Sequence, residues 1–315
     1  MSSKEYSSRS LVTRSIIGAC LLALPSASLM AEELTPRRWS HLPVDMNFLG
    51  AAYVYSDVSV DVDPVLQLED VTADIHTVAA RYIRSFSLFD RTARISVGQG
   101  FQEAKWRGIL DGERATAKRD GSTDTIVRFA VNLYGAPALS GKEYRQYRIK
   151  QSQDSEFIFG AGLSVQLPTG DYMESKLINI GSNRYTFRPQ FGGMYRNGPW
   201  SLEGTAVAAI YTENDEFWDG NKLEEEPLYS ARGHLIYDFM PGVWASASVL
   251  HNYGGRPKVN GITKDSEKQN TAWALSVGFP INKHLGVKLA YVGSRTHKDT
   301  GVDSDSFALG ISTFW

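Results

Sequence analysis

The sequence predicts an all-β chain that forms a single transmembrane antiparallel β-barrel of about 12 strands, with short periplasmic turns and long extracellular loops. Three observations predict this fold. Beyond the N-terminus, no run of about 18 apolar residues could form a transmembrane helix. Glycine (28), tyrosine (15), phenylalanine (14) and tryptophan (7) are plentiful. Apolar residues also alternate with small or polar ones, which is the period of a β-strand.

The N-terminus has the layout of a secretory signal peptide over residues 1–31. Basic residues precede a short apolar run, and small residues follow up to Ala31, after which we expect cleavage; Ala27 is the alternative cleavage position. A lipoprotein-type site at Cys20 is disfavoured, because Arg14 leaves almost no apolar run before it. Cleavage removes Cys20, the only cysteine, so the mature chain has no disulfide. The net charge of −2 gives no indication of a nucleic-acid partner.

The alternation places apolar and aromatic side chains on one face and small or polar ones on the other. The last segment is the clearest: Phe307, Leu309, Ile311 and Trp315 share one face. A water-soluble barrel would carry its charges outside and its apolar residues inside. The inverted pattern indicates lipid outside and polar contacts inside.

Such segments predict the strands in order, within a barrel over residues 44–315, near 44–56, 74–87, 92–106, 124–134, 154–167, 184–196, 200–213, 228–239, 243–253, 269–280, 285–294 and 305–315. Short turns near 89–91, 197–199, 240–242 and 282–284 alternate with long polar connections, which we expect to be extracellular loops, at 57–73, 107–123, 168–183, 214–227, 254–268 and 295–304. Residues 135–153 break this rule and predict an ordered periplasmic excursion. Residues 32–43 are expected to form a periplasmic N-terminal segment.

The predicted strand register turns a mostly basic set of side chains into the lumen. Its members are Arg81, Arg94, Arg128, Asn132, Arg184, Arg188, Gln190, Glu203, Tyr211, Arg232, His234, Asp238 and Lys288. They could line a solute path, or they could form ion pairs that brace the wall, such as Arg232 or Arg188 with Glu203. Small inward residues, among them Gly160 and Gly162, leave room for a channel or cavity. Plugging by loops or by residues 32–43 is an equal alternative.

The sequence does not predict an enzyme. The histidines beyond the signal peptide lie in no nucleophile or metal motif, and His251 and Ser248 are expected on opposite faces. No phosphate-binding loop or dinucleotide fingerprint predicts a cofactor, and no metal site is expected. The acidic stretch from Asp57 to Asp74 is interpreted as a solvated loop rather than a calcium site.

Several segments taken together resemble the outer-membrane β-barrel transporter family named for the MetA pathway of phenol degradation. The matching segments are DTIVRFAVNLYGAPALS from Asp124, LPTGDY from Leu167, GSNRYTFRPQFG from Gly181, PLYSARGHLIY from Pro227 and VWASASVLHNYGG from Val243. The resemblance implies a barrel that takes up small, aromatic or hydrophobic compounds. It supplies no catalytic residues.

The expected function is therefore an outer-membrane channel or transporter for small organic solutes, reached after export through the inner membrane. The alternatives are a structural or surface-binding barrel with a closed lumen and, less favoured, an interfacial enzyme. Outer-membrane lipid and the barrel-insertion machinery are the other expected partners. The terminal aromatics Phe314 and Trp315 resemble the signal that this machinery reads.

Overall fold

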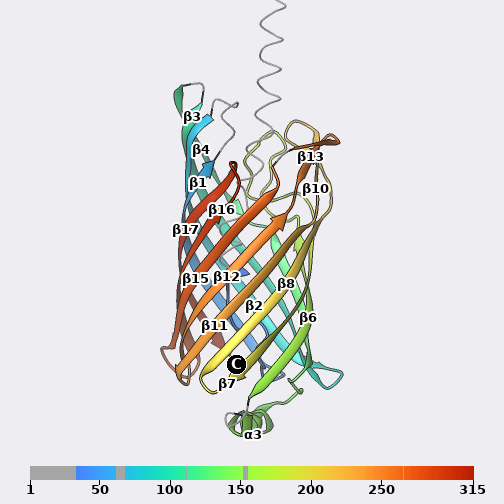
Figure 1. The fold of residues 1–315 in the computed structure, drawn as a ribbon, viewed down its shortest axis with the longest axis vertical. Coiled ribbons are helices and arrows are strands. Elements are labelled where there is room, and N and C mark those ends of the chain that lie inside the picture. The colour runs from blue at the N-terminus through green and yellow to red at the C-terminus, as the bar shows by residue number, and fades with distance from the viewer. Residues whose placement is uncertain (1–32, 62–67, 111, 152–154, 265) are drawn as a thin grey trace, which may run out of the picture.

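The computed structural model describes residues 33–61, 68–110, 112–151, 155–264 and 266–315. The expected signal peptide, residues 1–31, lies outside the described residues. Within them, one large antiparallel sheet closes on itself into a barrel, as Figure 1 shows. The chain enters the wall at β1 (Asn47–Asp61) and leaves it at β17 (Gly301–Phe314). These two strands pair from Phe48 with Phe314 up to Asp61 with Gly301, which closes the barrel.

The wall contains the twelve strands that the sequence predicts. β4 and β5 both pair with β3 and follow one another, so they act as a single wall strand. The order around the barrel otherwise follows the chain. Between the two closing strands lie β2 (Leu68–Leu88), β3 (Arg91–Leu110), β4 (Glu113–Ser122), β5 (Thr125–Tyr134), β6 (Glu156–Leu167), β7 (Thr186–Asn197), β8 (Trp200–Tyr211), β11 (Leu228–Met240), β12 (Val243–Gly254), β15 (Lys268–Pro280) and β16 (Leu285–Thr296).

One end of the barrel carries the short turns and the C-terminus, and is therefore the periplasmic end. The turn between β2 and β3 consists of Phe89 and Asp90, both with positive φ (50° and 57°). Positive φ at both central residues is typical of the type I′ turn, whose twist matches that of the flanking strands. The described part of the segment 135–153, residues 135–151, lies at this end and contains the helix α3 (Gly141–Gln151), lowest in Figure 1.

The opposite, extracellular end carries a small second sheet. It is formed by β9 (Asn214–Phe217), β10 (Asn221–Glu225), β13 (Pro257–Val259) and β14 (Ile262–Thr263). Phe217, Leu223 and Val259 form its apolar core. Two of the long polar connections expected as extracellular loops, 214–227 and 254–268, thus contain strands that pair with each other. No helix in the described residues is long and apolar enough to span a membrane.

In the upper part of β1, β2 and β3, the apolar side chains lie on the inward face of the strands and no longer on the outward face. Below, the outward residues are apolar; above, Val58, Ile75, Ala104 and Trp106 turn inward into a buried apolar cluster. This arrangement is that of a water-soluble sheet, so the wall continues beyond the membrane here. The connections expected at 57–73 and 107–123 are therefore much shorter than predicted, because most of their polar residues belong to extended strands.

Candidate functional site

The lumen of the barrel is occupied by the start of the described chain. We call residues Glu33 to Val44 the plug. Sequence analysis expected residues 32–43 on the periplasmic side; in the structure, Glu33 lies beside inward residues of the upper wall, and the segment reaches the periplasmic end only near His41. The alternative in which the N-terminal segment occupies the lumen therefore describes this geometry.

Trp39 is the main anchor of the plug and is fully buried. Its Nε1 donates a hydrogen bond to Oγ1 of Thr205 at 2.8 Å, and the guanidinium of Arg128 lies 5.8 Å from the ring centroid. The ring fits over Gly160 and Gly192, which face each other on β6 and β7. A Cβ on Gly160 would lie 2.6 Å from the ring carbon Cε3, so only glycine leaves room for this side chain.

Ion pairs hold the plug along its length. Glu33 pairs with Arg232 of β11, and Arg37 pairs with Asp238 lower on the same strand. The Arg37 guanidinium also lies 5.1 Å from the ring centroid of Trp244. The plug thus supplies a carboxylate to Arg232, for which the sequence had suggested Glu203 as a partner.

The plug backbone is satisfied by wall side chains. Oε1 of Glu203 accepts a hydrogen bond from the Arg38 amide at 2.9 Å, and Arg94 donates to the Arg38 carbonyl oxygen. Lys288 donates to Oγ1 of Thr35 at 3.3 Å. A buried irregular segment must find such partners, because it has no neighbouring strand that would pair with its backbone. Charged inward residues thus take the place that a neighbouring strand would have.

The top of the plug also has an apolar contact. Leu34 is buried at 2% exposure against Leu250, Ala272, Ala274 and Val292. These wall residues come from β12, β15 and β16, on the side of the lumen opposite Gly160. Opposite sides of the barrel wall therefore contact the plug.

At the periplasmic end, α3 and the loop before it hold His41. Nε2 of His41 lies 2.8 Å from the carbonyl oxygen of Pro137 and donates to it. The ring makes edge contacts with Tyr144 and Tyr147, and the Tyr144 hydroxyl donates to the His41 carbonyl at 2.9 Å. Burial lowers the pKa of His41 below its ordinary value, an effect that outweighs the hydrogen bond to Pro137.

The remaining predicted lumen residues make contacts within the wall. Arg81 donates to Ser96 at 2.9 Å, and Arg188 donates to Gln166 at 2.9 Å rather than pairing with Glu203 as suggested. Asn132 and Gln190 are buried at 1% and 2% exposure. The inward list thus divides into residues that contact the plug and residues that contact other wall residues.

Ser248 contacts a histidine, but the histidine is His234 and not His251, which was considered from the sequence. Nδ1 of His234 lies 2.8 Å from Oγ of Ser248, and both residues are buried inside the barrel. Among the described residues, Nε2 of His234 has no hydrogen-bond partner. An interfacial hydrolase needs its nucleophile at the lipid surface, so this pair does not have the placement that such an enzyme requires.

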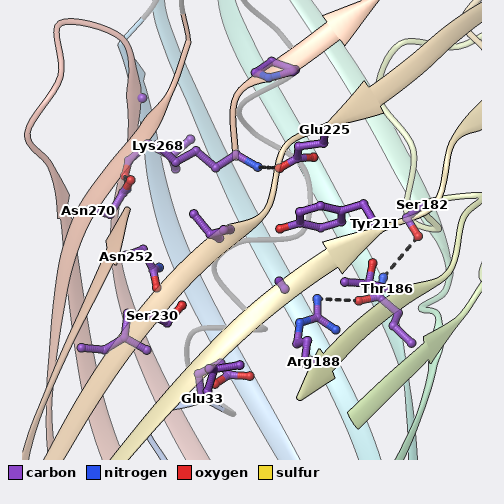
Figure 2. A pocket seen from close by; sticks show the side chains of 18 of the residues that line it. Glu33, Ser182, Thr186, Arg188, Tyr211, Glu225, Ser230, Asn252, Lys268 and Asn270 are labelled. Atoms are coloured by element: carbon purple, nitrogen blue, oxygen red, sulfur yellow. Dashed lines mark hydrogen bonds and ion pairs between the residues drawn. The ribbon is translucent and has the colours of Figure 1, made fainter. Parts of the chain in front are cut away.

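Above the plug lies a cavity of about 150 Å³ in the extracellular half of the lumen (Figure 2). Its walls combine apolar residues, including Val207, Ala209 and Leu250, with charged ones. The charged residues are Glu33, Arg184, Arg188, Glu225 and Lys268. Three basic against two acidic groups leave an excess of one positive charge.

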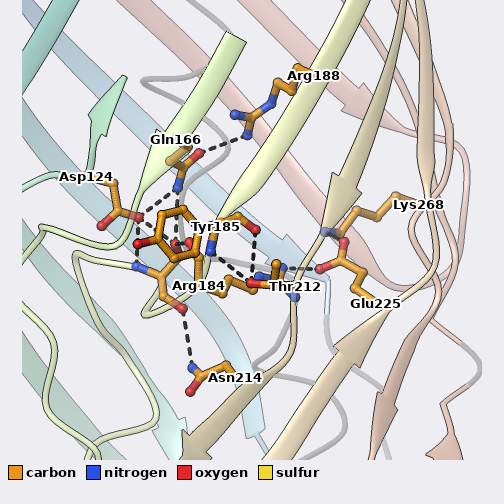
Figure 3. A network of polar contacts seen from close by, with 10 residues as sticks. Asp124, Gln166, Arg184, Tyr185, Arg188, Thr212, Asn214, Glu225 and Lys268 are labelled. Atoms are coloured by element: carbon orange, nitrogen blue, oxygen red, sulfur yellow. Dashed lines mark hydrogen bonds and ion pairs between the residues drawn. The ribbon is translucent and has the colours of Figure 1, made fainter. Parts of the chain in front are cut away.

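A polar network contributes Gln166, Arg184, Glu225 and Lys268 to the lining of this cavity (Figure 3). Buried Glu225 of β10 pairs with Arg184 and, at 2.7 Å, with Lys268 of β15. The Arg184 guanidinium lies 4.4 Å from the ring centroid of Tyr211. The small sheet is therefore tied to the wall by charges at the cavity.

The 168–185 connection is fixed by Asp124, where β4 gives way to β5. The Asp124 carboxylate accepts hydrogen bonds from Gln166 at 2.7 Å, from the Gly170 amide at 2.9 Å and from the Ser182 amide at 3.0 Å. Three of the segments that carry the family resemblance meet at this point. These family-like segments thus fold the 168–185 connection into a defined loop next to the cavity.

Sequence reasoning missed four contributors to the lumen. Glu225 and Lys268 were placed in connections, and Glu33 and Trp39 were not assigned to the lumen individually. The predicted small residue Gly160 was a usable signal for Trp39, because a bulky plug residue needs a stretch of wall without side chains. Glu225 had no comparable signal, since its burial depends on how the small sheet folds over the barrel.

Fold and lumen together define a twelve-stranded outer-membrane β-barrel whose own N-terminal segment occupies its interior. The chain belongs to the family described as "Putative MetA-pathway of phenol degradation", whose model matches residues 50–303. No curated protein sequence matches the chain.

Two solved structures share the fold. An outer membrane channel from Pseudomonas putida F1 is 17% identical with a TM-score of 0.73, covering 90% of this chain and 100% of that one. The translocator domain of the autotransporter NalP from Neisseria meningitidis is 12% identical with a TM-score of 0.51, covering 91% and 95%. At these identities the likeness establishes the architecture, an outer-membrane barrel, and no more.

Proposed function

We propose that the protein is an outer-membrane channel for small organic solutes, with a binding cavity above a plug that closes the lower path. The cavity of about 150 Å³ directly above Glu33 is the observation that carries this proposal. A sealed structural barrel has no need of an unfilled, partly apolar chamber at this place. The family description, which names phenol degradation, and the channel from Pseudomonas putida F1 both support the proposal.

The size and charge of the cavity indicate the class of solute. An apolar cavity of about 150 Å³ accommodates benzene in an engineered protein, so one aromatic ring fits this volume. The excess positive charge among Arg184, Arg188, Lys268, Glu225 and Glu33 favours a solute with one negative charge. A single-ring aromatic carboxylate, such as benzoate, has both properties.

The test compares two preparations in planar bilayers and in proteoliposomes. One is the mature protein and the other lacks residues 33–40, which removes Trp39 and the ion pairs of the plug. We expect low conductance from the first and a larger, steady conductance from the second. Both should form barrels, because the wall strands begin at Asn47.

Solute preference is tested in the truncated protein by swelling of proteoliposomes in benzoate and in uncharged benzyl alcohol. Lys268→Gln should slow benzoate entry about tenfold and leave benzyl alcohol entry unchanged, because one charge-assisted contact is lost. Lys298→Gln is the matched control, since Lys298 pairs with Glu267 outside the cavity. Absence of conductance from the truncated barrel would favour the closed structural barrel instead.

We also propose how the protein reaches its membrane. Residues 1–31 direct export through the inner membrane and are removed, and the barrel-insertion machinery recognises the end formed by Phe314 and Trp315. Recognition by the insertion machinery is supported by the position of Phe314 and Trp315, which lie exposed at the periplasmic rim of the closing strand.

A further inference from the structure

The hairpin of β3 and β4 carries an unusual set of charges on its outer face. Lys105 and Lys118 are directly paired across the two strands, and one row nearer the membrane Glu103 is paired with Asp120. All four side chains are exposed. Like charges directly opposite one another destabilise a sheet, so each row opposes the pairing of the strands.

The cross-strand neighbour of Lys105 on β2 is bound by other side chains. On the other side of Lys105 lies Asp74, whose carboxylate is bound by Arg107 at 2.6 Å and by the Tyr55 hydroxyl at 3.2 Å. Within the described part of the chain, no ion pair involves Lys105 or Lys118. The two ammonium groups are thus available to an external anion.

The pair lies at the level of the outer-leaflet headgroups. The outward residues of β3 from Ile95 to Phe101 are apolar except for Gln99, and those from Glu103 to Arg107 are charged. The ten residue-to-residue steps from Arg91 to Phe101 cover about 25 Å of height at a rise of about 3.3 Å and a tilt of about 40°, which matches the apolar band of such barrels. Lys105 and Lys118 then lie roughly 5–10 Å above the hydrocarbon.

We propose that this face binds a phosphorylated glycolipid of the outer leaflet. Directly paired residues of antiparallel strands lie about 5 Å apart at Cα, so both lysines can direct their ammonium groups to one phosphate. Glu103 and Asp120, one row lower, accept hydrogen bonds from sugar hydroxyls next to that phosphate. Phosphate above and hydroxyls below is the order of groups in a phosphorylated sugar headgroup, and a diacyl phospholipid lacks the sugar.

The test measures lipid retention by the purified mature protein with native mass spectrometry. The probes are diphosphoryl lipid A, lipid A with its phosphates removed, and phosphatidylglycerol. We expect the wild type to retain diphosphoryl lipid A in preference to the other two. The double variant Lys105→Gln/Lys118→Gln should retain about tenfold less, because two charge-assisted contacts are removed.

Two further variants separate the glycolipid from a general attraction to anions. Lys142→Gln/Lys283→Gln removes two exposed lysines at the periplasmic end and should bind lipid A as the wild type does. Glu103→Gln/Asp120→Gln should lose much of the preference for lipid A over phosphatidylglycerol. Heat-modifiable migration in gels shows that each variant is folded.

The proposal is overturned if the lysine variant retains diphosphoryl lipid A fully, or if dephosphorylated lipid A binds as well as the diphosphoryl form. Equal retention of phosphatidylglycerol by the wild type would identify a general anionic surface and equally overturn the glycolipid. None of these outcomes depends on conductance, so the channel proposal stands or fails separately.

Discussion

Trp39 shows how single residues decide whether the lumen is filled. Its ring occupies space that exists only because Gly160 and Gly192 lack side chains, and its Nε1 has a defined acceptor in Thr205. A buried aromatic with a satisfied polar group combines a large apolar contact with a fixed orientation. No other plug residue has all of these contacts, so Trp39 should dominate the docking of the plug.

Replacing Trp39 by alanine should therefore open the channel without unfolding the wall. Loss of a buried tryptophan costs roughly 3–5 kcal/mol, which would raise the undocked fraction of the plug at least about a hundredfold. The measurement is single-channel conductance in planar bilayers. Trp200→Ala is the control, because Trp200 lies on the outer face beside Tyr237. Unchanged conductance in Trp39→Ala would show that the remaining contacts suffice to hold the plug.

Alternation alone assigns residues to the inward face, because each strand turns every second side chain to the same face. Arg94, Glu203, Arg232 and Asp238 could be assigned to the interior in this way. Their partners could not be predicted, since Glu33, Arg37 and Arg38 lie outside any alternating segment. A non-strand segment carries no periodic signal that would place it inside a barrel.

Among the elements, α3 links the plug to the periplasmic rim. Two of its tyrosines enclose His41, and its Arg148 pairs with Glu156 at the start of β6 at 2.7 Å. The helix is thereby fixed to the wall by one contact and to the plug by another. Release of the plug requires His41 to leave this enclosure.

Lowering the pH should weaken that enclosure. Burial lowers the pKa of His41 in the docked plug, while the released plug has the ordinary value of 6.5. The contribution of neutral His41 to the free energy of plug docking is therefore fully present above pH 6.5, and it is lost as the pH falls below this value. Conductance should rise between pH 7.5 and about pH 5.

His41→Gln tests the assignment, because glutamine can still donate to the Pro137 carbonyl but does not titrate in this range. The variant should show a flatter pH dependence than the wild type. His284→Gln, at an exposed turn of the same rim, should leave the dependence as it was. An equally steep response in His41→Gln would assign it to another group.

The sequence predicted the existence of each wall strand but not the length of the first three. β2 spans Leu68–Leu88, well beyond the predicted 74–87 at its upper end, because acidic and basic residues there were taken as loop. Outward polar residues argue against a strand only where the wall is surrounded by lipid. Above the membrane the same residues are ordinary strand residues, and the inward Val58 and Trp106 supply the core.

For the whole molecule, closure between β1 and β17 is the step that completes the fold. Asn47 and Trp315 exchange two backbone hydrogen bonds at 2.9 and 3.1 Å, and the Phe314 ring lies 6.1 Å from that of Phe48. In lipid an open edge would leave backbone groups unpaired, so the last residues contribute to every closed barrel.

Deletion of Phe314 and Trp315 should lower the amount of assembled barrel in the outer membrane, because closure loses its final contacts and the terminal aromatics are gone. Barrels that do assemble should keep the wild-type solute preference, since neither residue lines the cavity. Heat-modifiable migration of membrane fractions measures the assembled amount. Trp315→Phe retains a terminal aromatic and should assemble normally; failure of that variant alone would contradict an aromatic signal.

The covalent connection between plug and wall changes the character of gating. Only Asp45 and Met46 separate the plug from β1, so the plug acts as a ligand tethered to its own receptor. A short tether gives an effective concentration on the order of millimolar, so even weak intrinsic affinity keeps the lumen filled. Opening is then a unimolecular event, independent of protein density in the membrane. A free peptide with the sequence of residues 33–44 would have to reach roughly millimolar concentration to close a truncated barrel again.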